Sequence, residues 1–290
     1  MTGVEYYLVM MFLASIAAGL LGALVGIGGG ILVTPILTIG FGVPVTYAMG
    51  ASIISVIGTS CGSASAFLKD RIINFRVGTL LNAVTTTGAV LGAVLTVFLI
   101  ETGLKWAIYI TFGVVLLMSS FDLYRRSKRL RRGGAEGPTQ RPGKLAEKLE
   151  LEGEYYDDAL KKKITYTPSG VVPGLSVMFA SGILSGLLGI GSGALNVLGL
   201  DREMKIPFKV CTTTSNFMIG VTAAASAGIF FIKGYINLII TGPVAVGVVL
   251  GSFLGAKLVM KSRPYSLAVI FVVILLLSGV EMIQKGVALL

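Results

Sequence analysis

The strongest constraint on the fold is a series of eight long apolar segments. Each has about 20 or more residues, the length that an α-helix needs to cross the ~30 Å hydrocarbon core of a bilayer. Only 13% of the residues are charged, against about 25% in a soluble domain. The chain is therefore predicted to be an all-α polytopic membrane protein. The segments run over 6–39, 45–68, 76–100, 104–124, 170–200, 206–232, 235–260 and 264–284.

The two halves of the chain align without a gap at a constant offset of 163 residues. Such internal similarity predicts a duplication. The expected organisation is a first membrane repeat over 1–124, a linker over 125–168 and a second membrane repeat over 169–290. The matched pairs include Gly19 and Gly182, Gly28 and Gly191, Gly30 and Gly193, Pro44 and Pro207, Ser52 and Ser215, and Thr59 and Thr222.

The linker holds 12 of the 24 basic residues and 7 of the 14 acidic residues. Two interpretations of it are open. The alternation of Leu149 and Leu151 before Gly153, followed by Ile164 and Tyr166, is typical of a small β-hairpin. A solvated linker explains the same polar composition equally well.

The first apolar segment of each repeat is too long for one crossing. As continuous helices, 6–39 and 170–200 would measure ~50 Å, and both contain glycines near the middle. We expect each to form two shorter helices joined at the glycines, as a hairpin or re-entrant pair.

The basic residues support this expectation. If both hairpins enter and leave on one side and the linker is cytoplasmic, 21 of the 24 Lys and Arg residues lie inside, and only Lys105, Lys233 and Lys285 lie outside. If every segment crosses once, most basic residues of the second half lie outside, which is the opposite of the positive-inside rule. The better arrangement predicts two inverted repeats, which are typical of secondary transporters.

Glycine-rich motifs mark both expected breaks. GIGGG at 26–30 and GIGSG at 189–193 would free backbone N–H groups that bind an anion. The small residues Gly22, Gly26 and Gly30 also fit a second interpretation, which is close helix packing. The predicted anion-binding residues in these motifs are Gly28, Gly29, Gly30, Gly191, Ser192 and Gly193.

The segment that follows each hairpin is rich in hydroxyl groups. Isolated Ser and Thr side chains usually bond back to their own helix, but the run from Thr212 to Asn216 is unusually dense. We expect Ser52, Thr213, Thr214, Ser215 and Asn216 to complete the anion site. Asn196 is a further predicted donor, as are Asn82 and Thr85. Arg76 is either a topology signal or an attractor for a cytoplasmic anion.

Several function classes lack their residues. The chain has no histidine, and its two cysteines are far apart in apolar segments, so no metal centre and no cofactor are expected. Asp122 and Glu281 are the carboxylates of the apolar segments, too few for a proton relay. No catalytic constellation is present, so the protein is predicted not to be an enzyme. The surplus of ten positive charges reflects membrane sidedness rather than nucleic-acid binding.

Both halves carry the same extended pattern. GLLGALVGIGGGILVTPIL and SGILSGLLGIGSGALNVLGL are each followed by a proline and a hydroxyl-rich helix, AMGASIISVIGTS or CTTTSNFMIG, and the linker contains KLELEGEYYD. This pattern resembles the TauE/SafE-type sulfite exporter family, also described as a sulfonate permease family. The resemblance implies a membrane transporter for sulfite or small organosulfonates, usually in the export direction. The two half-sites differ, because Ser192 replaces Gly29 and Pro35 has no counterpart.

The sequence thus predicts a secondary transporter that moves a small sulfur oxyanion by alternating access. A passive small-anion channel or a carboxylate permease is the alternative. The expected partners are the small anion and membrane lipid, without nucleic acid, and a homodimer is left open. We expect the protein in the cell (inner or cytoplasmic) membrane as a multi-pass protein, with linker 125–168 in the cytoplasm.

Overall fold

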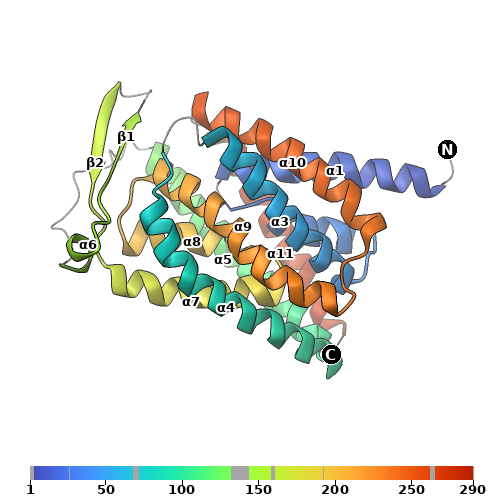
Figure 1. Ribbon diagram of the computed structural model, residues 1–290. Coiled ribbons are helices and arrows are strands. Elements are labelled where there is room, and N and C mark those ends of the chain that lie inside the picture. Colours follow the sequence, from blue (N-terminus) through green and yellow to red (C-terminus); the bar gives the residue numbers. More distant parts are fainter. Residues whose placement is uncertain are drawn as a thin grey trace.

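The computed structural model describes residues 3–25, 27–67, 72–131, 144–157, 161–191, 193–261 and 265–289. Eight helices in this part of the chain are long and apolar enough to cross a membrane. The structure therefore confirms the all-α polytopic membrane fold (Figure 1). Helices suit this environment because each satisfies its own backbone hydrogen bonds where no water is available.

The first apolar segment folds into a hairpin. α1 (Gly3–Val25) is followed by the short α2 (Gly30–Pro35), which continues into the π-helix η1 (Ile36–Gly40). The ring of Phe41 lies 6.5 Å from the ring of Tyr7, between centroids. The returning arm of the hairpin thus ends beside the beginning of α1.

The second repeat has the same hairpin. It consists of α7 (Val171–Leu188), α8 (Gly193–Leu198) and the π-helix η3 (Gly199–Glu203). The Ser169 N–H donates a hydrogen bond of 3.0 Å to the Met204 carbonyl, so this arm also returns to its own beginning. In Figure 1, α1 begins at the right and α7 begins at the left, beside the linker.

Three spanning helices follow each hairpin. They are α3 (Val45–Phe67), α4 (Phe75–Glu101) and α5 (Lys105–Arg131) in the first repeat, and α9 (Phe208–Ile232), α10 (Leu238–Lys261) and α11 (Tyr265–Val287) in the second. The structure differs from the sequence prediction at one boundary. The linker was expected from residue 125, whereas α5 continues to Arg131, because Arg, Lys and Leu are strong helix formers in water too.

Glycine contacts join the two repeats in a reciprocal pattern. Gly88 on α4 packs against the Phe179 carbonyl on α7, and Gly251 on α10 packs against the Ile16 carbonyl on α1. The two contacts are related by the offset of 163 residues at both partners. Each hairpin therefore packs its long arm on a helix of the other repeat, and only glycine lets the backbones come so close.

The linker forms a small folded unit. It contains α6 (Lys144–Lys148) and the antiparallel strands β1 (Gly153–Asp157) and β2 (Lys162–Tyr166), with Gly153 opposite Tyr166. Of the two interpretations left open by the sequence, the structure has the hairpin. Tyr166 is buried against the membrane part, where its Oη accepts a hydrogen bond of 3.0 Å from Asn74 Nδ2. Burial raises the pKa of Tyr166 to about 12.

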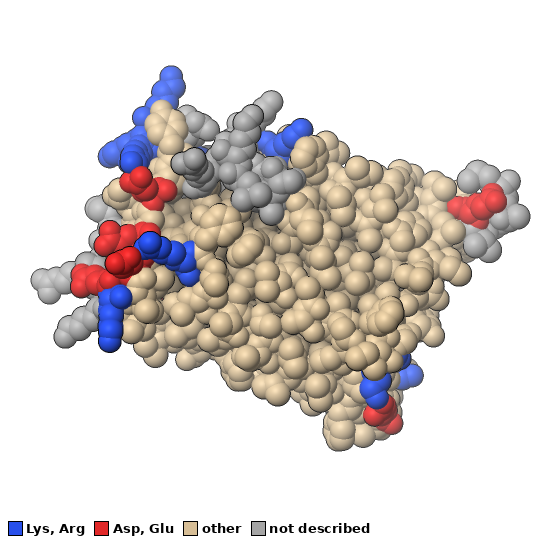
Figure 2. Space-filling model, in the orientation of Figure 1, with Lys and Arg blue, Asp and Glu red and all other residues tan. Residues whose placement is uncertain are grey.

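Charged side chains gather at the two ends of the molecule. Figure 2 shows a band without visible charged residues between these ends, as a lipid-facing belt requires. Ion pairs lie at both ends. Arg76 pairs with Glu150 at 3.1 Å at the linker end, and Lys233 pairs with Glu101 at 2.7 Å at the opposite end.

Candidate functional site

The tip of each hairpin packs against a helix of the other repeat. A Cβ on Gly28 would lie 2.7 Å from Ile219 Cδ1 on α9, and Gly191 packs against Val56 on α3 in the corresponding way. Val56 and Ile219 are themselves matched at the offset of 163 residues. The two hairpin tips thus converge with α3 and α9, and this convergence is the candidate site.

The backbone conformation requires glycine at both tips. Gly28 has a φ of 85° and Gly191 a φ of 78°, in the left-handed region that side chains disfavour. Gly193, the first residue of α8, packs directly against the Ile27 carbonyl of the other tip. The structure therefore brings together the predicted glycines of the two motifs that it describes. Ser192, the remaining predicted residue of the second motif, lies outside the described residues.

Gly29 is held from two directions. Its N–H donates a hydrogen bond of 3.3 Å to Thr59 Oγ1 on α3. Gly22, one turn before the end of α1, packs against the backbone of Gly29. The close-packing interpretation of the small residues is therefore correct for Gly22, and it accompanies the break rather than replacing it.

The hydroxyl groups of two predicted residues form hydrogen bonds with backbone carbonyls of the hairpins. Ser52 Oγ lies 2.8 Å from both the Gly30 and the Gly189 carbonyl oxygens, and it can donate its one hydrogen to either. The equivalent Ser215 Oγ donates to the Gly193 carbonyl at 3.2 Å. In both repeats the same hydroxyl thus links the hydroxyl-rich helix to the first residue of the returning arm.

Three other predicted residues lie away from the tips. Thr213 bonds back to its own helix. Thr214 Oγ1 accepts a hydrogen bond of 3.3 Å from the N–H of Asn74. Arg76 is exposed and binds Glu150 of the linker through the backbone carbonyl and the carboxylate. These contacts explain the three side chains without a ligand.

The further donors on α4 are also engaged. Thr85 Oγ1 donates to the Leu81 carbonyl of its own helix at 2.8 Å. Asn82 Oδ1 accepts a hydrogen bond of 3.4 Å from Thr222 on α9. Neither residue contacts the hairpin tips through a hydrogen bond that the structure shows.

Two buried amides retain unused hydrogen-bonding groups. Asn216 is fully buried, and neither its Nδ2 nor its Oδ1 has a partner among the described residues. It follows Ser215 directly and lies one turn before Ile219, so it shares the part of α9 that meets both tips. Asn196 on α8 accepts a hydrogen bond of 2.8 Å from Ser181, while its Nδ2 has no partner in the described chain.

Other unpartnered hydroxyls lie on the same elements. They belong to Thr34 on α2, Ser185 on α7 and Thr212 on α9. Further unpartnered hydroxyls belong to Thr86 on α4, to Ser169 and to Thr241 on α10. A buried polar group without a partner costs about 1–3 kcal/mol, so these groups indicate places for water or a polar ligand.

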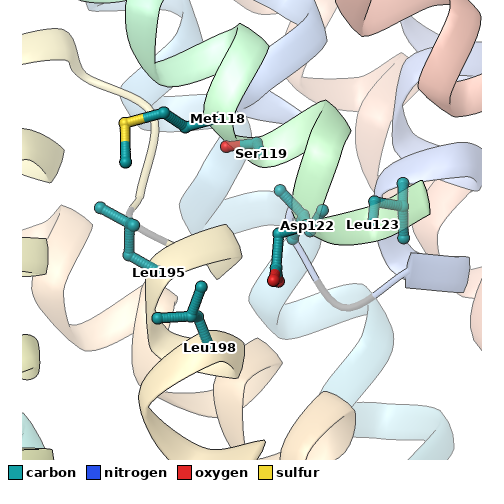
Figure 3. Close-up of a pocket in the computed structure, with 7 residues that line it drawn as sticks. Met118, Ser119, Asp122, Leu123, Leu195 and Leu198 are labelled. Atoms are coloured by element: carbon teal, nitrogen blue, oxygen red, sulfur yellow. The ribbon is translucent and has the colours of Figure 1, made fainter. Parts of the chain in front are cut away.

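A cavity with a volume of about 50 Å³ reaches the first tip from the linker end. This is room for a few water molecules. Figure 3 shows side chains of α5 and α8 facing each other across it. The lining residues are Ile27, Met118, Ser119, Asp122, Leu123, Leu195 and Leu198.

The sequence did not reveal the ion pair at this cavity. Asp122 Oδ1 lies 2.7 Å from Arg202 Nη2 on η3. From the sequence, Asp122 is only a carboxylate near a helix end, and Arg202 only a topology signal. The sequence carried no signal for the pair, because 80 positions separate the two residues and the repeat offset matches Asp122 with Lys285 instead.

The site is poor in formal charge. The sequence predicted free backbone N–H groups here, but those of Ile27 and Gly28 donate to the Gly22 carbonyl and that of Gly29 donates to Thr59. The donors that remain without a partner among the described residues are the amides of Asn196 and Asn216 and a few hydroxyls. Among the described residues, no group of three or more His, Cys, Asp or Glu side chains could hold a metal ion. Such a donor set suits a small anion, which it would bind by hydrogen bonds alone.

The chain matches a known family model over most of its length. The model is described as "Sulfite exporter TauE/SafE" and matches residues 11–282. The chain belongs to the TauE/SafE sulfite exporter family. It is a multi-pass membrane protein of a family of membrane transporters, and this name and the names of its relatives indicate transport rather than catalysis.

Relatives of this TauE/SafE chain occur in bacteria and archaea. It is 26% identical over 286 residues to the "Probable membrane transporter protein YunE" of Bacillus subtilis, covering 96% of this chain and 98% of that protein. It is 27% identical to "Probable membrane transporter protein YdhB" of the same organism, over 86% and 88% of the two chains. A probable membrane transporter protein of Methanocaldococcus jannaschii is 25% identical over 94% of each chain. No solved structure matches the chain significantly.

Proposed function

We propose that the protein is a secondary transporter that exports a small sulfur oxyanion, such as sulfite or an organosulfonate, across the cytoplasmic membrane. The family supports the class of transporter and the type of substrate. The proposed site lies at the two hairpin tips, and the linker faces the cytoplasm. The substrate is bound there without formal charge from the protein.

One observation carries this proposal: the unused amide of Asn216 beside the two tips. A fully buried amide without partners destabilises the fold. Such a group is retained where a ligand completes its hydrogen bonds. Its Nδ2 and the Nδ2 of Asn196 supply donors to an oxyanion.

We further propose that the two repeats are inverted across the membrane. The reciprocal packing of α1 on α10 and of α7 on α4 supports a two-fold relation between the repeats. The beginnings of the hairpins at opposite ends of the molecule support opposite orientations (Figure 1). The orientation agrees with the charge distribution that places most Lys and Arg residues inside.

Unequal packing around the two tips supports alternating access. The cavity at the linker end is lined by Ser119. Its matched residue at the other end is Met282, which is fully buried and lies 3.6 Å from Thr38 Oγ1 through its sulfur. The matched positions thus differ in side-chain size, a small serine beside the cavity and a methionine in contact with η1, as expected for a transporter that opens to one side at a time.

Counterflow in proteoliposomes tests the proposal. Vesicles loaded with unlabelled sulfite should accumulate labelled sulfite transiently if the protein is an alternating-access carrier, whereas a passive channel gives only equilibration. Organosulfonates and carboxylates of similar size serve as competing anions. Absence of counterflow with all of them would overturn the proposed mechanism.

Asn216→Leu provides the test of the site. Leucine has a similar volume and removes two unsatisfied polar atoms, so the melting temperature should stay the same or rise. Counterflow should nevertheless fall by at least about tenfold, since a charge-assisted hydrogen bond contributes about 1.5–3 kcal/mol. Thr213→Val, a change at a threonine bonded to its own helix, is the matched control. Wild-type counterflow in Asn216→Leu would move the site elsewhere.

A further inference from the structure

The ion pair between Asp122 and Arg202 stands at the mouth of the linker-side cavity. Asp122 lines the cavity whose inner end is Ile27, and Ile27 is buried at the hairpin tip. The Arg202 side chain is 45% exposed, whereas the Asp122 side chain is 17% exposed. The arginine therefore faces water while it contacts Asp122 in the wall of a cavity that reaches the first tip.

The matched position at the other end makes a related contact. Lys285 on α11 corresponds to Asp122, and its Nζ donates a hydrogen bond of 2.7 Å to the Thr38 carbonyl on η1. In both cases the last helix of one repeat holds the π-helix of the other repeat. The matched residues Asp122 and Lys285 have opposite charges. Nevertheless a cation, Arg202 or Lys285, lies at the returning end of each hairpin.

The chemistry of the pair suits recognition of an oxyanion. A guanidinium group binds the planar oxygens of a carboxylate through directed N–H donors, and it binds sulfur or phosphorus oxyanions in the same way. Asp122 is thus an internal anion that occupies the arginine. Asp201 and Glu203 flank Arg202 on η3, so the surroundings carry mixed charge, and Arg202 contacts the cavity wall through Asp122.

We propose that Arg202 is the first binding subsite for the substrate oxyanion on the linker side, and that Asp122 is its internal competitor. This inference rests on the proposed function. An arriving oxyanion replaces the Asp122 carboxylate on Arg202 and then passes along the cavity to the tips. The displaced carboxylate repels the bound anion and so shortens its stay on Arg202.

Substitutions of Arg202 and Asp122 should change the affinity for sulfite in opposite directions. With sulfite as the probe, isothermal titration of the full-length protein in detergent should show weaker binding for Arg202→Gln, by about tenfold, the low end for a charge-assisted hydrogen bond. Asp122→Asn removes the competitor and should tighten binding several-fold. Arg202→Lys should lie between Arg202→Gln and wild type, because the charge remains and the planar donors are lost.

An ion pair that only supports the fold gives a different result. Both Arg202→Gln and Asp122→Asn would then lower the melting temperature, and both would leave sulfite affinity unchanged or weaken it. Lys233→Gln breaks an exposed ion pair of the same length at the opposite end, and it should leave sulfite affinity as in wild type. Equal or same-sign effects of the two cavity variants on affinity would overturn the proposal.

Failure of the proposed function is distinguishable from failure of this inference. If wild-type protein binds and transports neither sulfite nor an organosulfonate, the proposed function fails. If wild type binds sulfite and Asp122→Asn binds it no more tightly, the function stands and the role of the pair is refuted.

Discussion

Replacing Gly193 with alanine tests whether the two hairpin tips touch as the structure shows. The added Cβ would overlap the carbonyl group of Ile27 and would lie 2.7 Å from its Cα. All of these are backbone atoms of the other tip. No rotamer change relieves the overlap, so the tips must separate.

The expected cost follows from this geometry. Forcing one extra carbon into a well-packed interior destabilises a protein by about 1–3 kcal/mol. For a large chain this corresponds to a fall in melting temperature of roughly 2–4 °C per kcal/mol. The equivalent Gly30 should lose less as alanine, because the nearest atoms to its Cβ belong to the side chains of Val56 and Ser52, and the nearest backbone atom, the Ser52 carbonyl oxygen, is 3.2 Å away.

Thermal unfolding of the detergent-purified protein, followed by circular dichroism, provides the measurement. Gly228 on α9 is the matched control, since nothing lies within 4 Å of a Cβ built there. Gly228→Ala should melt at or slightly above the wild-type temperature, because glycine costs up to about 1 kcal/mol inside a helix. If Gly193→Ala and Gly228→Ala have the same melting temperature, the tips do not touch and the reasoning is refuted.

Three further outcomes are expected. Ser52→Ala should destabilise the protein by about 1–3 kcal/mol, and Ser55→Ala, whose hydroxyl bonds only to its own helix, should destabilise it less in the same melting assay. Because the pKa of Tyr166 is raised to about 12, its neutral form stabilises linker docking fully below about pH 10. This contribution is lost as the pH rises through about 12, so Tyr166→Phe should flatten the alkaline fall in melting temperature; an unchanged fall would contradict the assignment. Ser119→Met should fill the linker-side cavity and slow sulfite counterflow several-fold, and unchanged counterflow would show that the cavity is not on the pathway.

The breaks in the first helix of each repeat could be predicted because they follow from length. An apolar segment of more than 30 residues exceeds the bilayer, and the glycines mark where it can open. The return of each hairpin followed from the loop charges, which are a property of the sequence alone. The end of α5 could not be read this way, since Arg131 lies beyond the apolar pattern and local helix propensity determines it.

The partners of the hydroxyl groups could not be predicted from the sequence. Ser52 lies 137 residues from Gly189, one of its two acceptors, and only the packing of two repeats brings them together. Thr213 and Ser215 are two positions apart on one helix, yet one bonds to its own helix and the other to a hairpin. The residue types show that the helix is rich in hydroxyl groups. The tertiary contacts decide which of these groups form hydrogen bonds to another element.

The distribution of hydrogen bonds among these groups would let the proposed uncharged site hold an anion. A broken helix exposes carbonyl oxygens as well as N–H groups, and a carbonyl beside an anion repels it. Ser215 places its hydrogen on the Gly193 carbonyl, and Ser52 places its single hydrogen on the carbonyl of Gly30 or of Gly189. They thereby withdraw acceptors from the tips and leave the amides of Asn196 and Asn216 as donors. Changing Ser215 to alanine should therefore weaken sulfite binding although its hydroxyl is engaged with the Gly193 carbonyl, and Ser215→Thr, which keeps the donor, should restore it.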